Sequence, residues 1–396
     1  MTDILPFRQS PNAIAHCYQN AQVDLKLMLT GHVHQAIPDV AQKAYQEHWQ
    51  CLSQYGSERF DMLFDKSWLV RQGFAELIDT EPERIALASS VHELFVRFLS
   101  CLDLKKRPRI LTTHREHPSI LRQLIRLKEQ GCELVFIDSD YATLVEKISQ
   151  AIDDKTAAVC ISSVNYVTGH QTFELDTLPP ICANYGTELF VDAYQSVNVL
   201  EFSIADYNLE TAFVAAGGGK YCQMGDGVCF MHVPEGSDFR PVITGWFGSF
   251  DPVLDSPAAE PLVYADGACR FDGSTTDALP HFRAEKVFEH FKREGLTPEL
   301  LYEINHHQLG YLVTEFLRQD FDPKVIRMTS SVEYMGGFVS FATRIAQPLH
   351  ERMRDIGVIC DYREDFLRLG PAPYLCDEQL RDSITAMKEA LVSLGY

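Results

Sequence analysis

Two side chains, an aspartate and a lysine, have the types and spacing for catalysis with an aldehyde cofactor. Asp192 ends the apolar run 188–192, and Lys220 follows it by 28 positions (220 − 192), directly after the glycine run 217–219. A lysine amine condenses with the aldehyde of pyridoxal 5'-phosphate (PLP), and an aspartate beside the pyridine nitrogen lets the ring accept electrons. Each residue alone has a simpler explanation, a helix cap for Asp192 and a surface charge for Lys220. Together they predict a PLP site.

Polar residues follow other predicted strands as well. Ser89-Ser-Val-His-Glu93 leads from a strand into a helix, and the free N–H groups of a helix N-terminus can bind a phosphate. Taken alone, a serine there is more often a simple helix cap than a ligand residue. Residues 114–119 and 164–169 follow two further strands. Because ligands of open α/β sheets bind beyond the carboxyl ends of the strands, we expect these segments to meet.

The elements that must position these residues form an α/β fold. Short apolar runs predict a mostly parallel seven-stranded sheet, with strands at 84–89, 109–113, 133–137, 157–163, 188–192, 212–216 and 228–233. Helical periodicity at 120–130 and 142–151 predicts crossover helices. After Pro280 the pattern changes to longer amphipathic segments with few strands between them, at 282–293, 298–318, 348–357 and 377–394. We expect an N-terminal segment (1–45) that packs with the small domain, a large domain (46–280) and a small α/β domain (281–396).

Composition excludes several classes of function. The chain has 396 residues, with 35 Lys+Arg against 55 Asp+Glu and a formal net charge of −20. This acidic balance argues against a nucleic-acid partner. The sequence shows neither a signal peptide nor the roughly 18 consecutive apolar residues of a membrane helix. Its 11 cysteines are scattered without a CxxC pair. We therefore expect a cytoplasmic protein with reduced thiols, no membrane partner and no structural metal.

Three segments resemble a known family. Phe190-Val-Asp-Ala-Tyr-Gln-Ser196 is similar to the V-D-A-x-Q-S segment of cysteine desulfurases, and Gly245-Trp-Phe-Gly248 to a segment typical of kynureninases. Asp361-Tyr-Arg-Glu-Asp-Phe-Leu-Arg368-Leu-Gly-Pro-Ala-Pro373 resembles the kynureninase pattern D-x-R-x-x-x-x-R-x-A-P-x-P. Over nearly its whole length the chain resembles the class V aminotransferase group of fold-type-I PLP enzymes, and within it the kynureninase branch.

The resemblance implies roles for individual residues. Lys220 and Asp192 would be catalytic, and a homodimer acting on a small amino acid substrate would be the working form. The implied cofactor contacts are the backbone N–H groups of Val91 and His92 on the phosphate, His117 stacked on the ring, Asn165 at the ring hydroxyl, Ser162 and Gln195 facing the cofactor, and Trp246 and Thr275 closing the phosphate site, partly from the neighbouring subunit.

The substrate carboxylate has one implied partner, Arg368. A planar guanidinium holds a carboxylate through two parallel hydrogen bonds, which suits this role. The alternative is an ion pair between Arg368 and Glu364 or Asp365. The leading hypothesis is hydrolysis of the Cβ–Cγ bond of kynurenine or a related aryl-ketone amino acid. An aminotransferase, a β-lyase or a non-catalytic protein with the same fold are the alternatives.

Some positions depart from the family patterns. Kynureninases carry a tyrosine immediately before the lysine and another before the T-G of the 165–169 segment, where this chain has Gly219 and Val167. Desulfurases use Ser and His before the lysine, at the places of Gly217 and Gly219, which disfavours desulfurase activity. His32-Val-His34 has a spacing that metals use, but no carboxylate or cysteine lies nearby in the sequence. We expect that segment to be a loop near the active-site entrance, without a metal.

Overall fold

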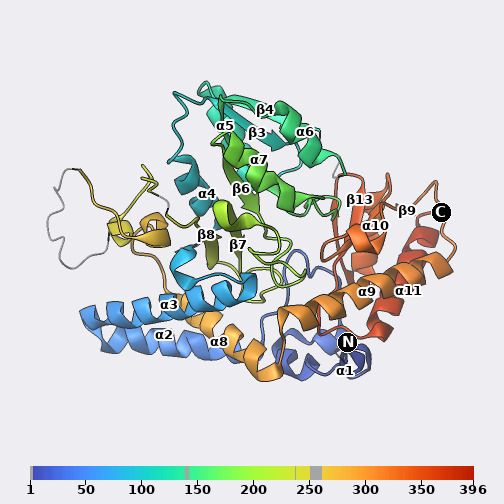
Figure 1. Cartoon of the computed structure of the whole chain (residues 1–396). Helices are drawn as coiled ribbons and strands as arrows, with labels where there is room; N and C mark the ends of the chain where they lie inside the picture. Colours follow the sequence, from blue (N-terminus) through green and yellow to red (C-terminus); the bar gives the residue numbers. More distant parts are fainter. Residues whose placement is uncertain (1–2, 139–141, 237, 250–260) are drawn as a thin grey trace.

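The computed structural model describes residues 3–138, 142–236, 238–249 and 261–396 (Figure 1). At its centre lies a seven-stranded sheet in the order β2-β8-β7-β6-β5-β3-β4. Only β8 runs against the other six strands. The strands are β2 (Ile85–Ala88), β3 (Arg109–Thr113), β4 (Glu133–Ile137), β5 (Thr156–Ser162), β6 (Glu188–Asp192), β7 (Phe213–Gly217) and β8 (Cys229–His232). The predicted strands agree with these bounds to within one residue at each end.

Both faces of the sheet are covered, which explains why its strands are continuous apolar runs. Every residue of β5 is buried, and successive residues alternate between two cores, Val159 and Ile161 toward one and Ala158 and Cys160 toward the other. The helices α4 (Val91–Leu99) and α5 (Pro118–Glu129) contribute to one core, and α3 (Arg59–Ile78), α6 (Leu144–Ala151) and α7 (Leu178–Asn184) to the other.

Two long helices and a third from later in the chain form a layer beside the sheet. The helices α2 (Gln42–Gln54) and α3 pack against α8 (Leu279–Glu294), and the three run along the lower edge of the view in Figure 1. Short 3₁₀ helices occupy many connections: η1 (Ala15–Ala21), η2 (Val23–Leu25), η3 (Asp39–Ala41), η4 (Gly56–Glu58), η5 (Pro82–Arg84), η6 (Leu175–Thr177), η7 (Leu209–Thr211), η8 (Trp246–Ser249), η9 (Gly267–Phe271) and η10 (Val332–Tyr334).

The C-terminal part has its own antiparallel sheet, in the order β12-β13-β10-β9. Its strands and helices are β9 (Arg327–Met328), β10 (Val339–Ala342), β12 (Asp361–Arg363), β13 (Phe366–Leu369), α9 (Pro298–Arg318), α10 (Ala346–Asp355) and α11 (Asp377–Ser393). The expectation of few strands after Pro280 is therefore wrong. Strands of two or three residues, such as β9 and β12, are too short to show an alternating pattern in the sequence.

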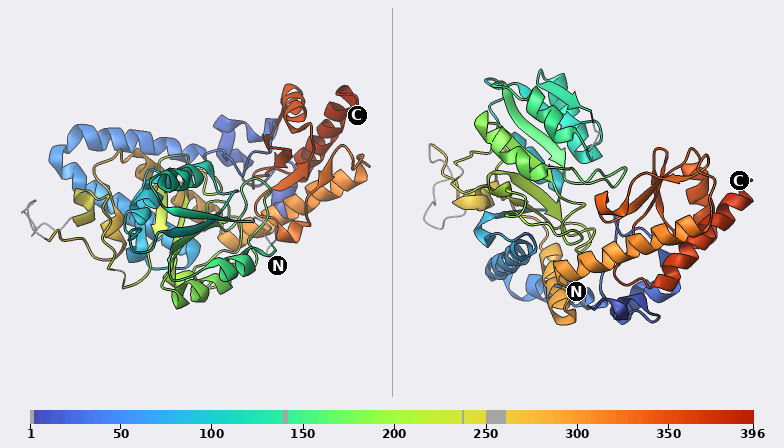
Figure 2. Two further views of the ribbon diagram at one scale, coloured as in Figure 1. Left: turned by 90° about the horizontal axis from the view of Figure 1, so that it is seen from above. Right: turned by 45° about the vertical axis from the view of Figure 1, so that its right-hand side comes forward.

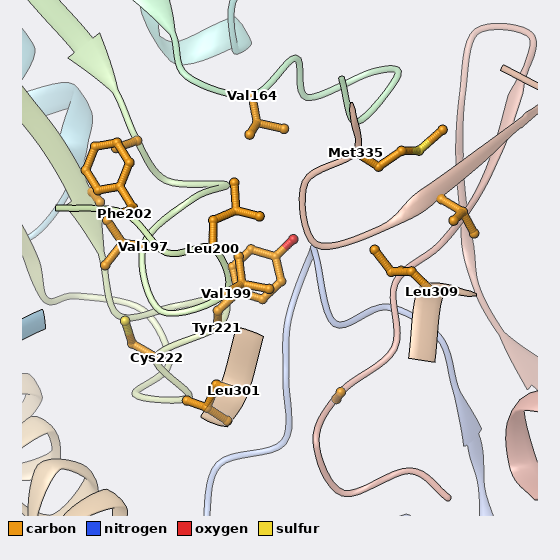
Figure 3. Close-up of a cluster of buried hydrophobic side chains, with 14 of the residues drawn as sticks. Val164, Val197, Val199, Leu200, Phe202, Tyr221, Cys222, Leu301, Leu309 and Met335 are labelled. Atoms are coloured by element: carbon orange, nitrogen blue, oxygen red, sulfur yellow. The ribbon is translucent and has the colours of Figure 1, made fainter. Parts of the chain in front are cut away.

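The N-terminal segment packs against this C-terminal part. After α1 (Leu5–Arg8), β1 (Leu27–Met28) pairs in parallel with β11 (Val358–Ile359), and Asn12 donates a hydrogen bond to the carbonyl oxygen of Pro373 at 2.9 Å. Figure 2 shows the dark blue segment beside the red C-terminal helices. Figure 3 shows a buried cluster in which Leu301 of α9 lies near Tyr221 and Cys222 from the large sheet's loops, and Leu309 of α9 lies nearer to Met335. The two parts thus share a continuous core.

Candidate active site

A cavity of about 460 Å³ lies beyond the carboxyl ends of the central parallel strands. Its walls come from the ends of β5 and β6, the turn after β7, the N-termini of α4 and α5, strand β13 and the segment 32–34. Parallel strands that end at one edge of a sheet bring their following loops together, as expected for this fold class. The segment 32–34 does lie at the site, and His32 is fully buried there.

Asp192 and Lys220 both face this cavity. Asp192 is the last residue of β6, only 8% exposed, and its Oδ1 accepts the N–H of Tyr194 at 3.0 Å. Lys220 follows β7, the neighbouring strand in the sheet. Burial lowers the pKa of Lys220 to about 8, although the Asp192 carboxylate acts in the opposite direction. An amine with a pKa near neutrality is a better nucleophile and base at physiological pH than an ordinary lysine.

The N-terminus of α4 forms another wall. Ser89, Ser90, Val91 and His92 all line the cavity, and the side chain of the N-cap Ser90 accepts the N–H of Glu93 at 3.2 Å. The first N–H groups of a helix have no intrahelical acceptors, and the helix dipole adds partial positive charge there. This end of the cavity is suited to an anionic group such as a phosphate.

Three further predicted residues also line the cavity. The ring of His117, the N-cap of α5, meets the ring of Tyr166 edge to face at 5.5 Å. Gln195 is held at both ends, because its amide donates to the carbonyl oxygen of His32 at 3.2 Å and accepts from the Tyr221 hydroxyl at 3.0 Å. Ser162, at the end of β5, lies in register with Asp192.

Three predicted cofactor contacts do not line this cavity. The Asn165 side-chain oxygen instead accepts the N–H groups of Val167 and Thr168 at 2.9 and 3.1 Å, so it stabilises its own turn. Trp246 donates to the Thr275 hydroxyl at 3.0 Å. Thr275 lines a neighbouring cavity of about 520 Å³, which shares Ser89 and Gly227 with the first. Within one chain, Trp246 and Thr275 therefore lie beside the site and not in it.

Arg368 reaches the cavity from the small sheet. It lies in β13 directly opposite Asp361 of β12, pairs with that carboxylate and donates to the carbonyl oxygen of Tyr166. The alternative of an ion pair with Glu364 or Asp365 is wrong, because the register of this hairpin places Asp361 beside Arg368. The buried Nε–H of Arg368 has no hydrogen-bond acceptor among the described residues. An unmatched guanidinium donor at a cavity wall suits a carboxylate ligand.

Asp361 also approaches His32. The His32 Nε2 lies 3.7 Å from Asp361 Oδ2, and its ring stacks on Phe338 at 4.3 Å. Burial lowers the pKa of His32 to about 3, so the imidazole is neutral. Burial alone would raise the pKa of Asp361, but the neighbouring His32 and Arg368 hold it well below its usual range. The positive charge of Arg368 is thus held in place by a permanently ionised carboxylate.

Glu116 is a buried residue that the sequence analysis missed. It accepts hydrogen bonds from the hydroxyls of Thr113 at 2.6 Å and Ser162 at 2.5 Å. Burial raises its pKa to about 7, and the negative charge of Asp192 adds to the shift. Its position directly before His117, at the end of a strand, was the signal that could have identified it. Glu116 fixes Ser162 at the cavity wall.

The donor set fits PLP. The cavity combines a lysine amine, a buried carboxylate, an imidazole and a helix N-terminus, the groups that such a molecule needs for its aldehyde, ring nitrogen, ring face and phosphate. The model of the aminotransferase class-V family matches residues 30–245 of the chain. The chain belongs to the class V aminotransferase family. Class V aminotransferases are PLP-dependent, and this chain is a PLP-dependent enzyme, not a non-catalytic protein with the same fold.

Individual class V relatives are distant. An uncharacterized aminotransferase, YcbU, of Bacillus subtilis (strain 168) is 23% identical over 359 residues, covering 90% of this chain and 92% of the relative. A kynureninase of Pseudomonas fluorescens is 25% identical over 282 residues, covering 69% of this chain and 64% of the relative. A structure of a C-DES variant with glycine covalently linked to its PLP cofactor aligns with a TM-score of 0.82 at 20% identity, covering 94% and 98% of the two chains. The fold is that of the fold-type-I PLP enzymes. No described helix has the length and apolar character needed to cross a membrane.

Proposed function

We propose that this class V enzyme acts on an α-amino acid and catalyses a kynureninase-type hydrolysis of the Cβ–Cγ bond of an aryl-ketone side chain. The observation that carries the proposal is the arrangement of Lys220, Asp192 and Arg368 around one cavity, with Arg368 provided by the D-x-R-x-x-x-x-R segment. The P. fluorescens kynureninase relative supports the same assignment.

Each of these residues has a distinct role in the reaction. Arg368 binds the substrate carboxylate, and its fixed pairing with Asp361 sets the orientation of the Cα–H bond. Lys220, with its lowered pKa, removes the α-proton as general base. PLP, when bound, supplies the electron sink for the resulting charge, and Asp192 lies where it can keep the ring nitrogen protonated.

Tyr166 supports the hydrolytic step. Val167 occupies the place of the family's tyrosine but is buried, whereas Tyr166, one position earlier, lines the cavity against His117. Its phenol can move a proton to or from the substrate's γ-carbonyl region. The overall reaction adds one water across the Cβ–Cγ bond and gives alanine and an aromatic acid.

The deciding assay incubates the purified holoenzyme with kynurenine and, separately, with 3-hydroxykynurenine. We expect alanine together with anthranilate or 3-hydroxyanthranilate in equal amounts. Absence of turnover with both substrates would overturn the hydrolase assignment.

The second candidate is an aminotransferase or β-lyase, favoured by the aminotransferase name of the B. subtilis relative. Solvent exchange of the α-proton, together with keto-acid or ammonia release, would identify that alternative.

The role of Arg368 makes a prediction of its own. Arg368→Lys keeps the positive charge but loses the two-pronged contact, so we expect KM to rise about 10- to 100-fold, with little change in PLP affinity. Arg381→Lys is the matched control, because Arg381 on α11 also pairs with a carboxylate, that of Asp382 at 3.1 Å, but does not line the cavity. Steady-state kinetics measure KM, and a PLP titration measures cofactor affinity, in both variants. An equal loss in both variants would contradict the assignment.

A cytoplasmic homodimer is the proposed working form. Apolar side chains are exposed on α2, α3 and the segment leading into η8, namely Trp49, Leu52, Trp68, Leu69, Val242, Ile243 and Trp246. Exposed large apolar side chains of this kind are typical of a subunit interface. In such a dimer Trp246 and Thr275 would help close the phosphate site partly from the neighbouring subunit, as the family resemblance implies. All 11 cysteines are free thiols, which fits a reducing compartment.

A further inference from the structure

The glycine run before Lys220 is not explained by its backbone. None of Gly217, Gly218 and Gly219 has a positive φ, so other residues could adopt these conformations. What prevents a side chain is the space around them. A Cβ on Gly218 would meet Met224 at 2.7 Å and Val228 at 2.9 Å, within the core. Gly218 is therefore required by packing.

The other two glycines both lie against the side chain of Tyr194, with Cys229 beside Gly217 and Asp226 beside Gly219. A Cβ on Gly217 would lie 2.8 Å from the Tyr194 hydroxyl oxygen and would also overlap Cys229 Sγ. A Cβ on Gly219 would lie 3.0 Å from the same hydroxyl and 3.1 Å from Asp226 Oδ1. The phenol thus occupies the space that side chains at positions 217 and 219 would otherwise fill.

Tyr194 is held firmly in that space. It follows Asp192 by two positions and lines the cavity, and its hydroxyl accepts the N–H of Gly219 at 3.2 Å. Lys220 Nζ lies 5.1 Å from the centre of its ring. Burial raises the pKa of Tyr194 well above its ordinary value, so the phenol keeps its proton. With the oxygen accepting from Gly219, that proton remains available for donation.

The wall beyond Tyr194 leads to the anion-binding end of the cavity. Its hydroxyl lies 3.9 Å from Cys229 Sγ, and Cys229 pairs in register with Ala88, just before the residues that open α4. The phenol therefore lines the same cavity as Lys220 and the N-terminus of α4, and Cys229 connects it to the strand that precedes α4. A protonated phenol in this position can donate to an anionic group that α4 also binds.

We propose that Tyr194 is a positioning residue for Lys220 and for the phosphate of PLP. It takes the place of the polar side chains that kynureninases and desulfurases carry directly before their lysine. Here the hydroxyl comes from the loop after β6, and Gly217 and Gly219 make room for it. Tyr194 fixes the backbone next to Lys220 and offers one hydrogen bond to the phosphate. This inference rests on PLP binding and does not depend on which amino acid is the substrate.

The first test is Tyr194→Phe, with PLP titrated into the apoprotein and followed by visible absorbance. We expect affinity to fall about tenfold, the usual effect of losing one hydrogen bond to a charged group, and the pH midpoint of the visible band to shift. Tyr374→Phe is the matched control. Tyr374 is buried and, like Tyr194, accepts a backbone N–H, from Ala36 at 2.9 Å, but it does not line the cavity. Unchanged affinity and midpoint in Tyr194→Phe would overturn the proposal.

A double-mutant cycle tests whether the Tyr194 hydroxyl and a side chain at position 219 compete for the same space. Gly219→Ala adds one methyl group against the Tyr194 hydroxyl, so we expect it to weaken PLP binding in the parent chain. In the Tyr194→Phe background the hydroxyl is absent, and the same alanine should cost much less. Thermal melting of all four proteins checks that each is folded. Strictly additive effects on PLP affinity would show that positions 194 and 219 act independently. That result would contradict the proposal that the Tyr194 hydroxyl takes the place of a side chain at position 219.

Discussion

Glu116 shows how a single buried acid can shape this site without lining it. Its carboxyl group accepts from Thr113 and Ser162, and Ser162 lies at the cavity wall in register with Asp192. A second ionised carboxylate so close to Asp192 would disfavour both charges. The raised pKa of Glu116 therefore reduces the negative charge that faces Asp192 near neutral pH.

Glu116 makes stability depend on pH. Its pKa is about 7 in the folded chain against 4.5 for an ordinary glutamate, so the folded state holds a proton that the unfolded chain has released. This contribution is fully present below about pH 4.5 and is lost as the pH rises through about 7, a change of about 3 kcal/mol. Glu116→Gln cannot ionise, and we expect urea unfolding of the apoprotein to favour this variant over the parent more at pH 8 than at pH 5.5. Glu58→Gln, at an exposed position, is the control. An equal difference at both pH values would contradict this account.

At the scale of elements, α4 and the β12–β13 hairpin hold the two ends of the site. The N-terminus of α4 is fixed by its Ser90 cap. The hairpin register places Asp361 opposite Arg368. Neither element carries Asp192 or Lys220. Together, however, they provide the groups that would bind the cofactor phosphate and the substrate carboxylate.

The Ser90 N-cap of α4 should affect both the stability of the fold and the binding of PLP. Ser90→Ala removes the bond to the Glu93 N–H, and we expect a loss of about 1 kcal/mol in unfolding free energy together with weaker PLP binding. Thr297→Ala removes an equivalent cap, since Thr297 accepts the N–H of Leu300 at 3.3 Å at the start of α9. Its stability loss should be similar, but PLP affinity should not change. If both variants bind PLP equally well, the N-terminus of α4 does not bind the phosphate of PLP.

The sequence predicts the large sheet well because its strands are buried on both faces and read as continuous apolar runs. Asp192 and Lys220 are predicted from their residue types and spacing and Ser162 from the family resemblance, and the topology explains why the strand ends that carry them meet. The prediction of Asn165 as a cofactor contact did not hold within the cavity, because its side-chain oxygen accepts the N–H of Val167 in its own turn. The sequence marks Glu116 by its place before His117, but its bond to Ser162 and the bond of Tyr194 to Gly219 join residues distant in the chain, so the roles of both had to come from the structure.

At the scale of the whole molecule, the exposed apolar patch on α2, α3 and the segment before η8 predicts a homodimer. Sedimentation should give a mass of about 90 kDa, twice the 44.9 kDa of the chain. Trp49, 70% exposed on α2, is part of this patch, so Trp49→Glu should shift the protein toward the monomer and weaken PLP binding. Leu317→Glu, on α9 and 67% exposed, is the control outside the patch. A monomeric parent, or a dimer that Trp49→Glu leaves intact, would contradict the proposed interface.

The most direct test of the whole account is where PLP attaches. Borohydride reduction of the yellow holoenzyme, followed by peptide mass spectrometry, should find the reduced cofactor on Lys220 and on no other lysine. Lys220→Ala should remove the label while the protein remains folded. A colourless protein that gains no visible band with added PLP, or a label on a different lysine, would contradict the central claim.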